Sequence, residues 1–126
     1  MPDQIIKERL EGIAEHIAVL QHRMEGIATP ADFKTEAGQV IYDSILMRLQ
    51  SIGENIKKIE DLEPGFCDER LNIEVGNIIR FRDLISHHYE LMDIQLIFDI
   101  VQNHIPSLNG VVTNYLNPGI KPRIGR

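Results

Sequence analysis

Apolar residues recur every three or four positions along most of this chain, a period that matches helices and does not match strands. One such repeat fills the first 27 residues and a second spans residues 33–59. Their members are Ile6, Leu10, Ile13, Ile17, Leu20, Met24 and Ile27, then Phe33, Val40, Ile41, Ile45, Leu49, Ile52, Ile56 and Ile59. No segment alternates convincingly between apolar and polar residues, so the sequence predicts two long amphipathic helices in an all-α protein.

Turn and cap residues set the expected ends of these two helices. Asp3 can cap the first helix, which would run to about residue 27. Thr29-Pro30-Ala31-Asp32 is typical of a helix start, with threonine as cap and proline at the first position. Residues 63–65, Glu-Pro-Gly, would end the second helix.

The second half of the chain predicts shorter helices. A third would run from a cap at Asp68 to about residue 90, and a fourth would start at Asp93 and be broken or kinked by Pro106 before a short fifth. Their apolar residues are Leu71, Val75, Ile78, Ile79, Leu84 and Ile85, then Leu96, Ile97, Ile100 and Val101, then Leu108, Val111, Val112, Tyr115 and Leu116. We expect an antiparallel four-to-five-helix bundle in one domain over residues 1–116, and a basic, loosely held tail over 117–126.

Composition favours a soluble, cytoplasmic protein. Of 126 residues, 43% are apolar and 25% charged, and no apolar run is long enough for a signal peptide or membrane span. The single cysteine, Cys67, excludes an internal disulfide or thiolate cluster and is expected to fill a loop or the core.

A polar cluster interrupts the third apolar stripe. Arg82 and His87 are five residues apart, about 140° around a helix axis, so they cannot meet side by side within one helix. Asp83 lies four residues before His87 and could hold its imidazole. Tyr89 falls seven residues after Arg82, back on the side of the arginine if the helix extends that far. Something outside this helix would have to bring Arg82 and His87 together.

The order Arg82, four residues, His87, one residue, Tyr89 resembles the R-x4-H-x-Y signature of HepT-like toxins, a branch of the HEPN superfamily of small helical ribonucleases. Asp83 fits the position after the arginine, which is usually polar in that family. The likeness covers most of the chain and implies a HEPN-like helical bundle.

Two further segments resemble the family. Residues 52–54, Ile-Gly-Glu, resemble a feature of its second helix, and a structural salt bridge is the favoured interpretation of Glu54. Residues 96–108 resemble a helix that ends in an Asp-Leu-Pro-x-Leu turn, from which His104 and Ile105 depart.

The resemblance implies a metal-independent endoribonuclease that is the toxin of a type VII toxin–antitoxin pair. In the family the active site forms where two subunits meet, so Arg82 of one chain would approach His87 of the other. Tyr89 would be the residue to which a partner nucleotidyltransferase antitoxin of the MNT type attaches AMP. The expected partners are RNA, a second copy of the chain and this antitoxin, with no membrane.

The chemistry of the two residues suits RNA cleavage. Histidine can move protons between the ribose 2′-hydroxyl and the leaving 5′-oxygen, and the arginine fork matches phosphate oxygens. The products would be a 2′,3′-cyclic phosphate and a 5′-hydroxyl. Because the 2′-hydroxyl takes part, no DNA partner is expected. Arg80 and His88 are candidates for RNA phosphate contacts. Arg80 could equally flank the helix as a surface residue, whereas for His88, which points away from its neighbour His87, a surface position is the favoured interpretation.

Cofactor and metal sites find no support in the sequence. A di-iron bundle requires Glu-x-x-His on two helices, and no acidic residue here is followed by histidine at that spacing. His16 and His22 are six residues apart and are expected to face solvent. Glycine-rich phosphate loops are also lacking.

The net charge of −6 gives no general attraction for RNA, so phosphate binding would depend on a local basic patch. Candidates are Arg80, Arg82, His87 and His88, then Arg48, Lys57 and Lys58, then Lys121, Arg123 and Arg126. The alternative function is a non-catalytic helical module that docks on a nucleotidyltransferase, with the cluster serving contact. A third interpretation, a dimeric scaffold, accounts for the apolar stripes but not for the motif of Arg82, His87 and Tyr89.

Overall fold

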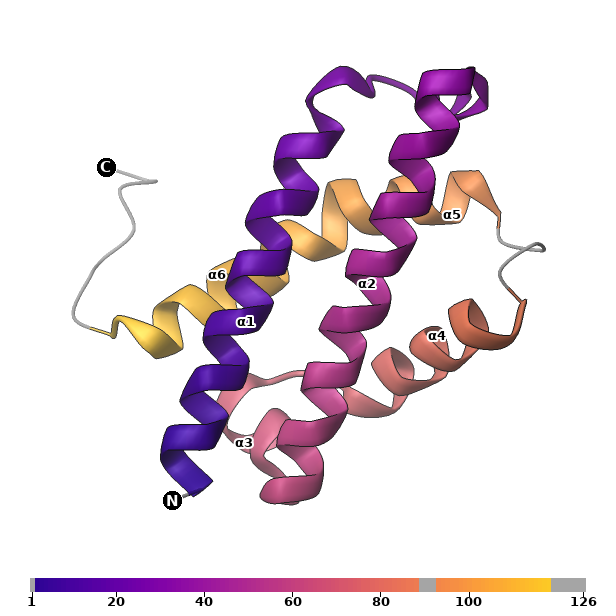
Figure 1. Cartoon of the computed structure of the whole chain (residues 1–126). Coiled ribbons are helices and arrows are strands. Elements are labelled where there is room, and N and C mark those ends of the chain that lie inside the picture. The colour runs from indigo at the N-terminus through magenta and orange to yellow at the C-terminus, as the bar shows by residue number, and fades with distance from the viewer. Residues whose placement is uncertain (1, 89–92, 119–126) are drawn as a thin grey trace.

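The computed structural model of the protein describes residues 2–88 and 93–118, and the side chains of residues 2, 87 and 88 fall outside that description. Six α-helices form a bundle, and no strand occurs in the described ranges. Helices α1 (Pro2–Arg23) and α2 (Glu36–Leu62) are the longest and lie antiparallel (Figure 1). The expected all-α helical bundle is confirmed. No helix in the described part of the chain is long and apolar enough to cross a membrane.

The two long helices share the hydrophobic core. All seven residues of the stripe expected in the first helix are buried. The stripe of α2 is buried from Ile45 to Ile59, but Val40 is 68% exposed, so its inclusion in the core stripe was wrong. Val40 lies in the second turn of α2, where the neighbouring Gly38 and Ile41 face inward instead.

Two 3₁₀ turns, Met24–Gly26 and Pro30–Lys34, join α1 to α2. Thr29 and Asp32 form a capping box at the second turn, where the sequence predicted that Thr29 would cap the second helix. This turn ends at Lys34, however, and Thr35 caps α2 through Gly38 N–H. Hydrogen bonds from the Thr29 and Ala28 N–H groups lower the pKa of Asp32. Asp3 lies inside the first turn of α1 rather than before it.

The expected long third helix is two helices, α3 (Phe66–Leu71) and α4 (Val75–His88). Gly65, not Asp68, is the cap of α3. The break falls at Asn72, whose φ of 55° is left-handed and ends the helical ladder. The N–H of Ile73 then returns to the carbonyl of Cys67 at 2.9 Å. Leu71 and Ile73, on the two sides of the break, are both buried. The apolar pattern of the sequence therefore continues without interruption across it.

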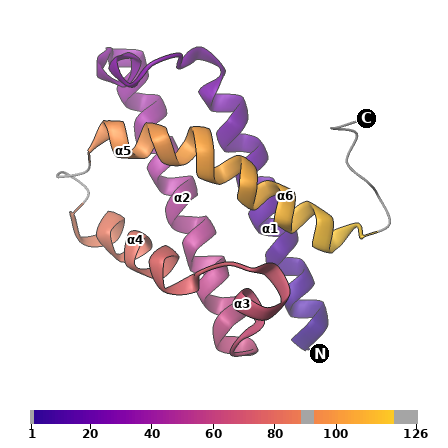
Figure 2. The same cartoon turned by 180° about the vertical axis from the view of Figure 1, so that it is seen from behind.

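The chain after Asp93 crosses the long helices as one nearly continuous run (Figure 2). Asp93 caps α5 (Ile94–Asp99) by accepting from Gln95 N–H, as expected. A π-helical turn, Ile100–His104, leads into α6 (Ile105–Leu116). Pro106 neither breaks nor ends the run, because it lies in the first turn of α6, where its missing N–H is tolerated. Leu96, expected in the core stripe, is 42% exposed.

Candidate active site

Arg82 lies where α4 packs against α2. A Cβ built on Gly53 of α2 would come within 2.9 Å of the Arg82 Cβ and 3.1 Å of its Cγ. Atoms this close cannot coexist without movement of the helices, so the absent side chain of Gly53 lets α4 approach α2 at this point. As a result, the Arg82 side chain is only 18% exposed although it carries a full charge.

Two carboxylates hold the Arg82 guanidinium. Its Nη1 donates to Glu54 Oε1 on α2, and its Nη2 pairs with Asp83 Oδ1 at 2.7 Å. The Nε is buried, and no acceptor lies within hydrogen-bond distance of it among the described residues. The salt bridge expected of Glu54 is therefore present, and its partner is Arg82. Asp83 was expected beside His87, and the structure places its carboxylate on Arg82.

A second polar contact crosses the same helix pair one turn further on. Gln50 Nε2 of α2 donates to Ser86 Oγ of α4 at 2.8 Å. Gln50 and Glu54 are four residues apart, as are Ser86 and Arg82, so the two contacts form successive rungs between the helices. We call this pair of contacts the α2–α4 seam. The contact from Gln50 holds Ser86, the residue immediately before His87.

The structure places the other predicted site residues incompletely. His87 and His88 belong to the last turn of α4, but their side chains and the whole of Tyr89 lie outside the described residues. Arg80 is exposed and donates to the Asn77 side chain, which in turn donates to Glu74. The contacts that the structure gives Arg80 thus lie away from the α2–α4 seam.

Two of the basic residues that the sequence suggests for phosphate binding, Arg48 and Lys57, contact other side chains of the protein. Arg48 Nη1 lies 3.0 Å from His16 Nδ1 and so ties α2 to α1, and Lys57 pairs with Asp61 at 2.9 Å. His16 is half-buried, which corrects the expectation that it faces solvent. Burial and the nearby Arg48 charge lower its pKa, because both disfavour the imidazolium. His22 is exposed, as expected.

Cys67 is fully buried beneath α2 and is therefore a core residue, one of the two expected roles. Burial, followed by the charge and hydrogen bond of Glu60, raises the pKa of its thiol to about 12. A thiol so placed has almost no thiolate at neutral pH and cannot act as a nucleophile. Within the described part of the chain, no three His, Cys, Asp or Glu side chains gather as metal ligands would.

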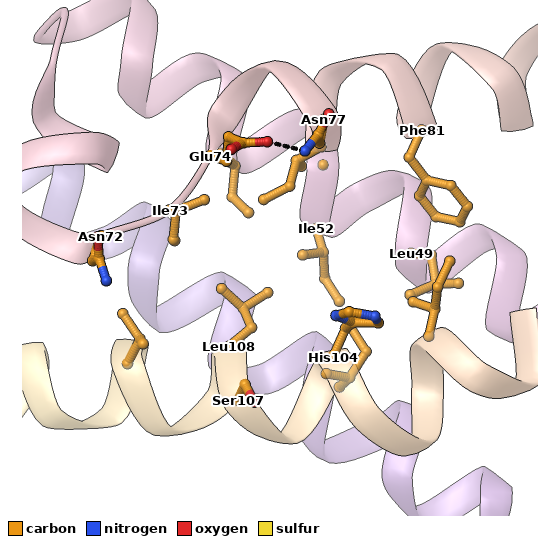
Figure 3. A pocket seen from close by; sticks show the side chains of 16 residues that line it. Leu49, Ile52, Asn72, Ile73, Glu74, Asn77, Phe81, His104, Ser107 and Leu108 are labelled. Carbon is orange, nitrogen blue, oxygen red and sulfur yellow. Dashed lines mark hydrogen bonds between the residues drawn. The ribbon is translucent and has the colours of Figure 1, made fainter.

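A cavity of about 400 Å³ opens between α4 on one side and the π-helical turn and α6 on the other (Figure 3). Leu49, Ile52 and Phe81 give it a mainly apolar lining. His104 and Glu74 provide polar groups at its edges. Arg82 does not line the cavity, but Gly53, which contacts Arg82, does. The sequence contained no signal for this cavity, because it depends on how far apart α4 and α6 are held.

Comparison with known protein families gives a match that covers most of the chain. The sequence model of the family described as Ribonuclease HepT-like matches residues 6–114 of the chain. Comparisons with curated proteins and with solved structures found no significant match. The matched span reaches from α1 into α6 and contains Glu54, Arg82 and His87. Since it covers most of the 126 residues, the chain belongs to the HepT-like ribonuclease family.

Proposed function

We propose that this protein is a metal-independent endoribonuclease toxin in which Arg82 and His87 cleave RNA at a site composed from two subunits. The observation that carries the proposal is the immobilised Arg82, held at the α2–α4 seam within the matched family span. Maintaining a charged side chain at 18% exposure has a desolvation cost, which a ligand-binding role would explain.

The reaction is a transphosphorylation within RNA. The ribose 2′-oxygen bonds to the adjacent phosphorus while the bond from phosphorus to the 5′-oxygen breaks. The His87 imidazole accepts the 2′-hydroxyl proton and delivers it to the departing 5′-oxygen. Arg82 stabilises the charge that accumulates on the phosphate oxygens. The fragments end in a 2′,3′-cyclic phosphate and a 5′-hydroxyl.

A second subunit would resolve two difficulties of a single chain. Positions 82 and 87 of α4 are about 140° apart around the helix axis, so the two residues face different directions. Within one chain, Arg82 also faces two carboxylates, whose combined charge exceeds its own and repels phosphate. A symmetric dimer would bring His87 of one chain to Arg82 of the other and place the basic residues of both chains around one phosphate.

Regulation would follow from Tyr89, two residues beyond His87. A nucleotidyltransferase antitoxin of the MNT type would attach AMP to its hydroxyl, and the added bulk and negative charge would exclude RNA. The cognate pair would therefore act as a cytoplasmic toxin–antitoxin system. Tyr89→Phe would escape this neutralisation and remain toxic in the presence of the antitoxin.

The experiment that tests this function is digestion of total RNA by the purified protein in EDTA, followed by analysis of the fragment ends. We expect cyclic phosphate ends from the native protein and at least a hundredfold slower cleavage by Arg82→Ala and His87→Ala. Arg23→Ala, which removes an exposed arginine of α1, is the matched control and should cleave normally.

Failure of the unmodified native protein to cleave RNA would overturn the proposal. Mass spectrometry must first show that Tyr89 carries no AMP. The non-catalytic docking module would then be the better account, and it predicts that the same two variants weaken binding to the nucleotidyltransferase.

A further inference from the structure

We infer that Glu54 is a positioning residue, which fixes the Arg82 guanidinium for the phosphate of the substrate. This inference rests on the proposed ribonuclease function and assigns to it a residue of α2 that lies outside the Arg-His-Tyr motif. Its basis is the contact between Glu54 Oε1 and Arg82 Nη1, which joins residues 28 positions apart in the sequence.

The contact joins two packed helices. Glu54 lies about two turns before the end of the 27-residue helix α2, next to the buried Gly53 that makes room for the Arg82 side chain. The rung from Gln50 to Ser86 holds the same two helices one turn away. Asp83, in contrast, is the sequence neighbour of Arg82 on α4, although the two carboxylate side chains are similarly exposed, at 42% for Glu54 and 51% for Asp83. Glu54 is therefore the carboxylate that ties Arg82 to another element.

Holding the arginine in advance favours catalysis, because a free arginine side chain loses about 2 kcal/mol of rotamer entropy when it is immobilised. The Glu54 contact fixes the guanidinium before RNA binds. It also leaves donors for the substrate, since a guanidinium has five N–H groups and the two carboxylates occupy one on each Nη. One N–H remains on each Nη nitrogen, enough for two bonds to a phosphate.

The same contact carries an electrostatic cost, and this makes the role testable. A carboxylate beside the phosphate site repels the substrate, so its removal should not weaken RNA binding. If Glu54 acts through orientation, its loss lowers kcat and leaves KM unchanged or lower. If it were instead a latch that keeps Arg82 from RNA, its loss would raise activity.

The experiment compares RNA cleavage by the native protein, Glu54→Ala and Glu54→Gln. We expect kcat to fall about tenfold to a hundredfold in Glu54→Ala, the range expected for a misplaced catalytic group. Glu54→Gln retains an oxygen that can accept from Arg82 and should recover part of the loss, with the pH profile of kcat unchanged. The matched control is Asp61→Asn, which removes another carboxylate of α2 and breaks its pair with Lys57, and it should cleave normally.

Several outcomes would overturn the inference. Native activity in Glu54→Ala or increased activity in either variant would do so. So would a Glu54→Gln protein as inactive as Glu54→Ala with one limb of its pH profile lost, because that pattern marks a general base. Thermal unfolding of each variant shows whether it is folded. If the native protein cleaves no RNA, the proposed function is refuted. If the native protein cleaves RNA and the Glu54 variants cleave it at the same rate, only the positioning role is refuted.

Discussion

Arg82 can reach Glu54 because residue 53 has no side chain. The Gly53 position lies opposite the Cβ and Cγ of Arg82, the stem of that side chain rather than its flexible end. A methyl group there cannot be accommodated by rotating the guanidinium alone. α4 must move away from α2, because no change of rotamer moves the Arg82 Cβ.

Gly53→Ala should therefore impair cleavage more than it impairs stability. We expect the free energy of unfolding to fall by about 1–3 kcal/mol, as for overpacked cores, and kcat to fall at least tenfold because Arg82 is displaced. Urea denaturation and RNA cleavage at a temperature where the variant is folded measure the two effects. Gly26→Ala is the control, since a Cβ there meets no atom within 4 Å. Equal activity in Gly53→Ala and native protein would contradict the importance of the close approach.

At the scale of residues, the sequence predicts which side chains are candidates for catalysis better than it predicts which side chains contact one another. The spacing of Arg82 and His87 predicts the catalytic pair through the family resemblance, and the structure adds what holds the arginine. Glu54 could be suspected of forming a salt bridge, but its partner could not be identified. A pair 28 residues apart depends on the relative rotation of two helices, which no local pattern encodes.

Helix boundaries were less predictable than the existence of helices. The stripes of α1 and most of α2 follow from periodicity because each faces one core along its whole length. The break between α3 and α4 escaped detection because the apolar repeat continues across it, and only the left-handed Asn72 marks the interruption. The π-helical turn before α6 likewise has no sequence signal beyond Pro106.

The contact between α1 and α2 through His16 and Arg48 predicts a pH-dependent stability. Arg48 can only donate, so His16 Nδ1 must accept and hence be unprotonated. The pKa of His16 is lower in the folded protein than its ordinary value of 6.5, so the unfolded chain binds the proton more readily. The contribution of this contact is complete above about pH 6.5 and declines as the pH falls towards the folded pKa.

Replacement of His16 by glutamine should remove this dependence while preserving an acceptor for Arg48. Between pH 7.5 and 5.0, the urea midpoint of the native protein should fall further than that of His16→Gln. Gln21→Ala is the control, because it changes an exposed residue of α1 that does not ionise, and it should retain the native pH dependence. If the urea midpoints of the native protein and His16→Gln fall equally between pH 7.5 and 5.0, the contact between His16 and Arg48 does not make stability depend on pH.

For the whole molecule, charge is the main constraint on function. The chain carries a net charge of −6, and within one protomer Arg82 is outnumbered by the carboxylates that contact it. Affinity for a polyanion must therefore come from a local field that one chain supplies poorly. The proposed dimer, in which each chain completes the site of the other, would supply basic groups from both chains and would also overcome the angular separation of Arg82 and His87.

Mixing two inactive variants tests this account most directly. Arg82→Ala and His87→Ala are combined so that subunits exchange, and RNA cleavage in EDTA is measured alongside each variant alone. A mixed dimer has one site with both substitutions and one with neither, so we expect cleavage to return to about a quarter of the native rate. If native protein cleaves RNA and tagged subunits are shown to exchange, yet the mixture stays inactive, the composite site is wrong.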